Sequence, residues 1–268
     1  MSEILSYSFF QRALFAGLLA GGLCGLLSVY IISKQMAFIG QGISHAAFGG
    51  VSLGLLLSID PLIPAAFFAV IMALGVAWLS SSGRTNRDTI IGILMASSMA
   101  LGVVFLSLAK GYKGSVISYL FGNILAVTNK DLIWLTAVSL ISVIFVLLFR
   151  KELTFFLFDE RIARISGIPI NLIQIGLLIC IAFAVIASVH MVGIILVTAF
   201  LVIPGAIGQT LGRRLYVLFV ISLLSGILSV IIGLFVSYLL NIPSGATIVL
   251  VLTFFFGMAR IANSLFSK

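Results

Sequence analysis

The sequence predicts an all-helical protein that crosses a membrane about eight or nine times. Apolar residues make up 62% of the 268 residues and charged residues only 8%, whereas a soluble domain carries about 25% charged residues. The apolar residues form long runs, each close to the roughly 20 residues that a helix needs to cross a bilayer. These runs lack the polar alternation of membrane β-strands, so the spans are expected to be helices.

Nine apolar runs are candidate spans. In chain order they cover residues 13–32, 36–57, 62–80, 89–109, 132–149, 170–189, 191–211, 215–240 and 246–262. Merging one broken segment would reduce the count to eight. At about 30 residues for each helix and its loop, the runs use the whole length of the chain. We therefore expect a single transmembrane domain over residues 1–268, and any soluble machinery has to come from partners.

The charged residues mark the ends of the runs. Asp60, Asp88 and Asp131 each stand just before an apolar run, where they are typical helix-start residues. The sequence places no carboxylate in the middle of a run, which argues against ion-coupled carriers and intramembrane proteases. It also contains no GxxxxGK[ST] loop, so we do not expect this chain to be an enzyme that hydrolyses ATP.

The net charge of +8 comes from basic residues that are scattered between the runs. They form no stripe with interleaved aromatic residues, so we expect no nucleic-acid partner. Nine alternating spans with the C-terminus inside leave only Arg12, Lys110, Lys113 and Lys130 outside. The positive-inside rule therefore favours an outer N-terminus. The two cysteines, Cys24 and Cys180, lie far apart in apolar runs and are expected to be buried hydrophobic residues.

Two runs are more polar than the others. The segment 36–54 contains Gln41, His45 and five glycines, and the segment 197–212 contains Pro204 and three glycines. Such helices break easily, and interrupted polar helices tend to line a cavity. The alternative is close helix packing, because several glycines have GxxxG spacing.

Two histidines are candidate metal contacts. Gln41 and His45 are four residues apart and therefore share one helical face. A neutral imidazole suits zinc or manganese as a weak, transient ligand, although His45 is equally compatible with an interhelical hydrogen bond. His190 falls at the presumed outer end of a span, where a histidine is usually just hydrated.

The longest charged stretch, 155–169, falls on the expected cytoplasmic side. Its mixed charges on a short amphipathic turn, closed by Gly167 and Pro169, suit a surface helix that presents charges to a partner. A plain solvated loop is the alternative.

Five blocks of sequence, taken in order, resemble the membrane subunits of zinc and manganese ABC importers. They are QMAFIGQGISHAAFGGVSLG (35–54), SYLFGNILAVTNKDL (118–132), FDERIARISGIP (158–169), VGIILVTAFLVIPGAI (192–207) and IPSGATIVL (242–250). The same order occurs more distantly in permeases for vitamin B12 and iron siderophores. The resemblance covers nearly the whole chain.

The resemblance implies a type II ABC importer-like permease in the plasma (inner) membrane of a prokaryote. Two copies would enclose the pore, with cytoplasmic ABC ATPase subunits that bind ATP and an extracellular or periplasmic metal-binding protein. The segment around Phe158 would be gripped by the ATPase. The residues implied for that contact are Phe158, Asp159, Glu160, Arg161, Ala163 and Gly167.

The same resemblance assigns the metal path to Gln41, Ser44 and His45, with His190 at its outer end. The family commonly has Asp or Glu where this chain has Gln41. Losing that carboxylate weakens the binding of hard cations, which favours zinc over manganese. A metal chelate such as a siderophore, or a carrier or channel that works without an ATPase, remains the alternative function. The metal is cargo, and no bound cofactor is expected.

Overall fold

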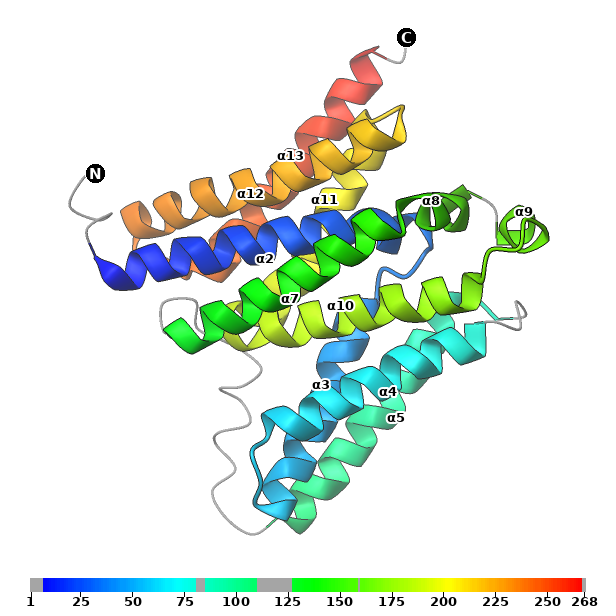
Figure 1. The fold of residues 1–268 in the computed structure, drawn as a ribbon. Coiled ribbons are helices and arrows are strands. Elements are labelled where there is room, and N and C mark those ends of the chain that lie inside the picture. Colours follow the sequence, from blue (N-terminus) through cyan, green and yellow to red (C-terminus); the bar gives the residue numbers. More distant parts are fainter. Residues whose placement is uncertain (1–6, 81–84, 110–126, 159, 267–268) are drawn as a thin grey trace. The chain divides into compact units, whose positions relative to one another are not determined.

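The computed structural model describes residues 7–80, 85–109, 127–158 and 160–266, and only the backbone of residues 161, 162, 164 and 266. Every regular element in this part of the chain is a helix, which confirms the predicted fold class (Figure 1). The helices are α2 (Ser8–Ser33), α3 (Ile39–Leu57), α4 (Leu62–Ser80), α5 (Arg87–Leu108), α7 (Asn129–Leu148), α8 (Arg150–Phe158), α9 (Glu160–Ile165), α10 (Ile170–Val192), α11 (Ile194–Leu211), α12 (Leu215–Leu240) and α13 (Ser244–Phe266). Most of the sequence block 118–132 lies outside the described residues.

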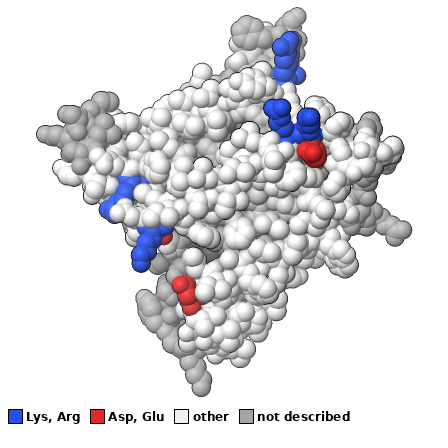
Figure 2. Space-filling view, viewed as in Figure 1, with Lys and Arg blue, Asp and Glu red and all other residues white. Residues whose placement is uncertain are grey.

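Eight of the described helices are long and apolar enough to cross a membrane, in agreement with the lower of the two predicted numbers. They are α2, α4, α5, α7, α10, α11, α12 and α13. Helix α3 has 19 residues but is not among them, because Gln41, His45 and its glycines make it more polar. The face visible in Figure 2 carries few charged residues, as expected for a chain in a bilayer. The orientation of the N-terminus stays a prediction.

Contacts divide the chain into two compact units. The first unit comprises Met1–Ile32, Phe121–Ser139 and Ala187–Lys268, and the second comprises Ser33–Leu120 and Leu140–Ile186. Among the described helices, α2, α11, α12 and α13 belong to the first unit, and α3, α4, α5, α8 and α9 to the second. Helices α7 and α10 contribute to both. The expectation of one permease domain over residues 1–268 stays a prediction.

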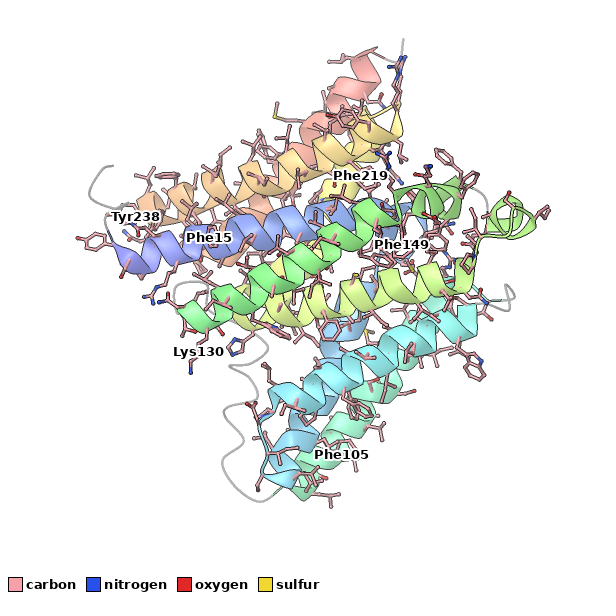
Figure 3. The ribbon with its side chains drawn as sticks, in the orientation of Figure 1. Phe15, Phe105, Lys130, Phe149, Phe219 and Tyr238 are labelled. Carbon is pink, nitrogen blue, oxygen red and sulfur yellow. The ribbon has the colours of Figure 1, made fainter. Side chains whose placement is uncertain are left out.

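Glycines and serines hold the helices of the first unit together. A Cβ atom on Gly226 of α12 would lie 2.5 Å from the Gly21 carbonyl oxygen of α2, so the two backbones touch. One turn away, the Ser222 hydroxyl donates to the Gly25 carbonyl oxygen at 2.6 Å and lies 2.8 Å from the Ser28 hydroxyl. Small residues permit this approach, and hydroxyl groups add hydrogen bonds between helices. The ring of Tyr30 on α2 lies 5.3 Å from the ring of Phe219 on α12, the latter labelled in Figure 3.

In the second unit, α3 packs against α4 and α5 (Figure 1). Gly50 of α3 lies directly against Pro64 and Ala65 of α4, and Gly49 lies against the Ser98 carbonyl oxygen of α5. A side chain at either glycine would push these helices apart. The glycines of α3 therefore allow its neighbours to approach closely.

Helices α3 and α11 are continuous. The expectation that these two segments are interrupted helices is therefore wrong. Pro204 lies inside α11 without ending it. Gly205, the next residue, packs against the backbone of Ser28, and Gly208 packs against Leu218. The predicted alternative, close packing through small residues, is confirmed for these helices.

Replacing Gly226 by alanine is expected to lower the melting temperature of the purified protein. The new methyl group would meet the Gly21 carbonyl oxygen, and overpacking of this kind costs about 1–3 kcal/mol. Gly92→Ala is the matched control, since a Cβ atom at Gly92 has open space and alanine is the better helix former. Thermal unfolding in detergent measures both variants, and equal melting temperatures would contradict the packing described here.

Candidate functional site

Helix α3 carries a polar face that the rest of the unit leaves unsatisfied. Gln41 and His45 lie one turn apart on it, and both side chains are partly exposed. Among the described residues, neither side chain has a hydrogen-bond or ion-pair partner. An amide and an imidazole with no partner in a mostly apolar helix are available to a ligand or to a second protein chain.

Backbone features at both ends position this helix. Gln35 has a φ of 54°, a left-handed backbone conformation, in the connection between α2 and α3. Asp88, in the first turn of α5, accepts a hydrogen bond from the Phe38 amide at 3.3 Å, just before α3 begins. At the other end, Ser58 takes the left-handed conformation that caps the helix. The polar face of α3 is thus anchored to the start of α5.

Ser44 lies on α3 but not on the exposed part of its polar face. Its side chain is fully buried, and its hydroxyl donates to the Gly40 carbonyl oxygen at 2.7 Å. This bond satisfies the hydroxyl within its own helix. A contact between Ser44 and a transported ion stays a prediction.

His190 belongs to the first unit, at the last turn of α10, and faces Asp131 in the first turn of α7. The Nδ1 atom of His190 lies 3.8 Å from the Oδ1 atom of Asp131. Asp131 is also a helix cap, as predicted, because its Oδ2 atom accepts hydrogen bonds from the Thr128 amide at 3.0 Å and the Thr128 hydroxyl at 2.7 Å. The pairing of Asp131 with His190 has no signal in the sequence.

No group of three or more His, Cys, Asp or Glu side chains that could hold a metal ion occurs among the described residues. Tight zinc sites use three or four such ligands. The described part of the chain offers single or paired candidate ligands instead.

A second polar cluster centres on Glu160, the first residue of α9. The Glu160 Oε1 atom accepts hydrogen bonds from Lys34 Nζ at 2.9 Å and from Arg87 Nη2 at 2.6 Å. Both cations also lie against the ring of the fully buried Phe156, with Lys34 Nζ 4.3 Å from its centroid. We call these four residues the Glu160 cluster. Within the second unit it joins α8 and α9 to the start of α5 and to Lys34, which precedes α3.

Electrostatics keep Glu160 ionised. Burial alone would raise the pKa of its carboxyl group, but the hydrogen bonds and positive charges of Lys34 and Arg87 outweigh this effect and lower the pKa below its ordinary value. The cluster lies beside an open cavity of about 430 Å³. The residues that line the cavity are Ser33, Lys34, Gln35, Ser80, Thr85, Asn86, Arg87 and Glu160.

The predicted coupling segment has apolar residues that are exposed and apolar residues that are buried in the protein. Phe158 is 76% exposed and Ile165 is 88% exposed, whereas Ala163 is fully buried. Gly167 ends the segment with a φ of 77°, a conformation that favours glycine. Asp159 and the side chain of Arg161 lie outside the described residues. Phe158 and Ile165 are thus two large apolar side chains that the charged segment leaves uncovered.

The family resemblance implies a partner contact for Glu160, whereas its intramolecular ion pairs have no signal in the sequence. Lys34 and Arg87 are 126 and 73 positions away from it, and in the sequence they read only as topology signals. No spacing rule connects them. Only the packing of α8 and α9 against Lys34 and the start of α5 brings the three charges together.

The described residues form eight candidate spans, a polar face on α3 and a charged segment between two spans, which is the architecture of a multi-pass membrane protein. Comparison with protein families defines the class of the protein more narrowly. The model of the ABC 3 transport family matches residues 6–263, so this chain belongs to that family. The predicted class, a permease of the metal ABC transporter type, is confirmed.

Two related transport proteins align with nearly the full length of this chain. The manganese transport system membrane protein MntC of Halalkalibacterium halodurans is 36% identical over 258 residues, which is 96% of this chain and 88% of the relative. A probable iron transport system membrane protein of Haemophilus influenzae is 33% identical over 257 residues, 96% of this chain and 94% of the relative.

Solved structures agree with the fold. PsaBC from Streptococcus pneumoniae, in complex with Fab, has a TM-score of 0.82 and 29% identity over 96% of this chain and 93% of that chain. An inward-facing conformation of a putative metal-chelate type ABC transporter has a TM-score of 0.73 at 17% identity, over 94% and 86% of the two chains, and supports the fold alone. The chain is thus a multi-pass membrane protein of the kind found in bacterial transport systems.

Proposed function

We propose that this chain is the membrane-spanning subunit of an ATP-driven importer for a divalent metal ion. The observation that carries the proposal is the unpartnered pair of Gln41 and His45 on α3, in a family whose members named above serve manganese and iron transport. An imidazole and an amide oxygen bind such ions weakly enough to release them. ATP and an external binding protein would supply the driving force and the affinity.

Manganese is the first metal to test, followed by iron and zinc. The lack of a carboxylate at Gln41 favours zinc, and that preference stays a prediction. The names of the relatives support manganese and iron instead. Ser44 and His190 are proposed as further contacts of the path.

The proposed partners are those that an ABC importer requires. The proposed assembly is a homodimer of this chain, with its single permease domain of residues 1–268, two cytoplasmic ATPase subunits and an external metal-binding protein. ATP hydrolysis is assigned to the separate ATPase subunit. Alternating access would follow when ATP draws the two ATPases together and moves the coupling segments.

The proposed coupling contact is the segment 155–169. Its exposed apolar residues, Phe158 and Ile165, would enter the ATPase surface together with Asp159, Arg161 and Gly167. Glu160 and Ala163 have a different part, because Glu160 is tied to Lys34 and Arg87, and Ala163 is buried. These two residues would hold the segment in place for the contact.

Purification in mild detergent tests the proposed assembly. The tagged chain from its native membrane is expected to bring down a cytoplasmic protein with a Walker motif in near-equal amount, as identified by mass spectrometry. Replacing Phe158 by serine removes an exposed apolar side chain and should weaken this association about tenfold, the typical loss at an aromatic contact of this kind. The control Phe9→Ser changes another exposed phenylalanine, which lies in α2 and outside the segment.

A chain that purifies alone, stable and homogeneous, would contradict the proposal and favour a carrier or channel. Equal loss of the ATPase in both serine variants would contradict only the assignment of the contact to Phe158.

A further inference from the structure

The pair formed by Asp131 and His190 has the geometry of two ligands that share a metal ion. Their facing atoms, Oδ1 and Nδ1, are 3.8 Å apart, which is too long for a hydrogen bond. Two ligand atoms at about 2.1 Å from one transition-metal ion are about 3–3.5 Å apart at tetrahedral or octahedral angles. A shift of a few tenths of an ångström closes the difference.

The carboxylate is held in the orientation that such a site needs. Its Oδ2 atom is occupied by the Thr128 amide and hydroxyl, while Oδ1 is the atom that faces His190. Hydrogen bonds to one carboxylate oxygen orient the other toward a metal, as outer partners do in established metal sites. Thr128 is therefore a positioning residue for this pair.

Both side chains are accessible to an ion from solvent. The His190 side chain is 42% exposed and the Asp131 side chain 24%. His190 lies in the last turn of α10, where the negative end of the helix dipole favours a cation. Exposed Lys130, labelled in Figure 3, adds an opposing positive charge next to Asp131. A two-ligand site with this neighbour binds weakly and releases its ion readily.

We infer that Asp131 and His190 form a weak receiving site for a divalent transition-metal ion at the end of the permease predicted to face outward. This inference rests on the proposed function and adds to it a carboxylate that the path of Gln41 and His45 lacks. An ion handed over by the external protein would first meet one hard oxygen and one imidazole nitrogen, with water completing its coordination.

Acylation by diethylpyrocarbonate, followed by mass spectrometry, tests the site in the purified full-length chain. The chain contains two histidines, so each is read separately. Mn²⁺ is expected to slow the acylation of His190 about tenfold when its concentration is roughly ten times the dissociation constant. Asp131→Asn should abolish this protection. Asp60→Asn, the same change at another helix-start residue, should retain it.

Mg²⁺ at equal concentration controls for simple charge screening, because magnesium disfavours imidazole ligands. Protection of His190 by Mg²⁺ to the same extent, no protection by Mn²⁺, or undiminished protection in Asp131→Asn would each overturn the inference.

Uptake by the complete transporter separates this inference from the proposed function. Asp131→Asn and His190→Gln are each expected to raise the half-saturating Mn²⁺ concentration about tenfold, with less change in the maximal rate. Unchanged saturation in these variants, with normal uptake in the wild type, would overturn the receiving site and leave the importer intact. A wild-type transporter without metal uptake would overturn the proposed function itself.

Discussion

Replacing His45 by alanine should lower metal-ion uptake by the assembled transporter at least about tenfold, since loss of one ligand or its support has effects of this size. His45 is the only imidazole on α3, and within the described residues its side chain has no partner that would explain it as a structural group. Removing it therefore takes from α3 the one imidazole that this helix offers to a metal ion. Uptake of radioactive manganese by cells or proteoliposomes measures the effect.

The matched control is Ser97→Ala on α5, a change at a side chain whose hydroxyl donates to the carbonyl oxygen of Ile93 in its own helix. Both variants should retain the co-purifying ATPase, because neither residue lies in the coupling segment. Normal uptake by His45→Ala would return this histidine to a packing role and remove the main support for the metal path.

Replacing Glu160 by glutamine is expected to uncouple ATP hydrolysis from uptake. The change keeps the size of the side chain but leaves Lys34 and Arg87 close together, mostly buried and without their shared carboxylate. Loss of charged hydrogen bonds of this kind costs about 1–3 kcal/mol. The coupling segment would then no longer be tied to Lys34 and the start of α5, and its movement would not reach α3.

The measured quantity is the amount of metal transported per ATP hydrolysed, which we expect to fall about tenfold, as a coupling free energy of roughly 1.4 kcal/mol corresponds to that factor. Glu152→Gln makes the same chemical change in α8, outside the Glu160 cluster, and should leave the ratio unaltered. A Glu160→Gln transporter with a normal ratio would show that the Glu160 cluster has no part in coupling.

The stability contributed by the Glu160 cluster should depend on pH in a defined direction. The pKa of Glu160 is lowered in the folded protein, so the ion pairs contribute fully at neutral pH and are lost as the pH falls through that lowered value. The difference in melting temperature between the wild type and Glu160→Gln should be constant near pH 7 and shrink in acid. A difference that instead grows in acid would contradict this assignment.

Much of the fold follows from hydrophobic length alone. The predicted runs 62–80 and 215–240 coincide with α4 and α12, because each is bounded by residues that cannot continue an apolar helix: Pro61 with Asp60, and the pair Arg213 and Arg214. Helix-start signals were also sufficient at Asp131, whose carboxylate closes a cap with Thr128.

Contacts between residues of different helices could not be predicted from the sequence. Glycine and proline predicted interruptions in α3 and α11, but neighbouring helices stabilise both as continuous helices, with Gly50 and Gly205 at the closest contacts. The pairing of Glu160 with Lys34 and of Asp131 with His190 joins residues from different helices. No periodicity along one segment contains that information, because the partners meet only after the helices pack.

The candidate site also has features that the sequence predicts and features that only the packed structure shows. The shared face of Gln41 and His45 follows from helical spacing, and the structure retains it. Ser44, one residue before His45, points its hydroxyl into its own helix instead. A spacing argument placed the polar face, whereas the burial of each side chain on it required the neighbours α4 and α5.

Uptake of manganese into proteoliposomes tests the central claim most directly. The chain is reconstituted with or without its co-purified ATPase, the external binding protein is loaded with radioactive Mn²⁺, and ATP is supplied on the cytoplasmic face. The account predicts ATP-dependent accumulation only when the ATPase is present, and little uptake by the His45→Ala chain. Accumulation by the chain alone, independent of ATP, would contradict the importer and identify a carrier or channel.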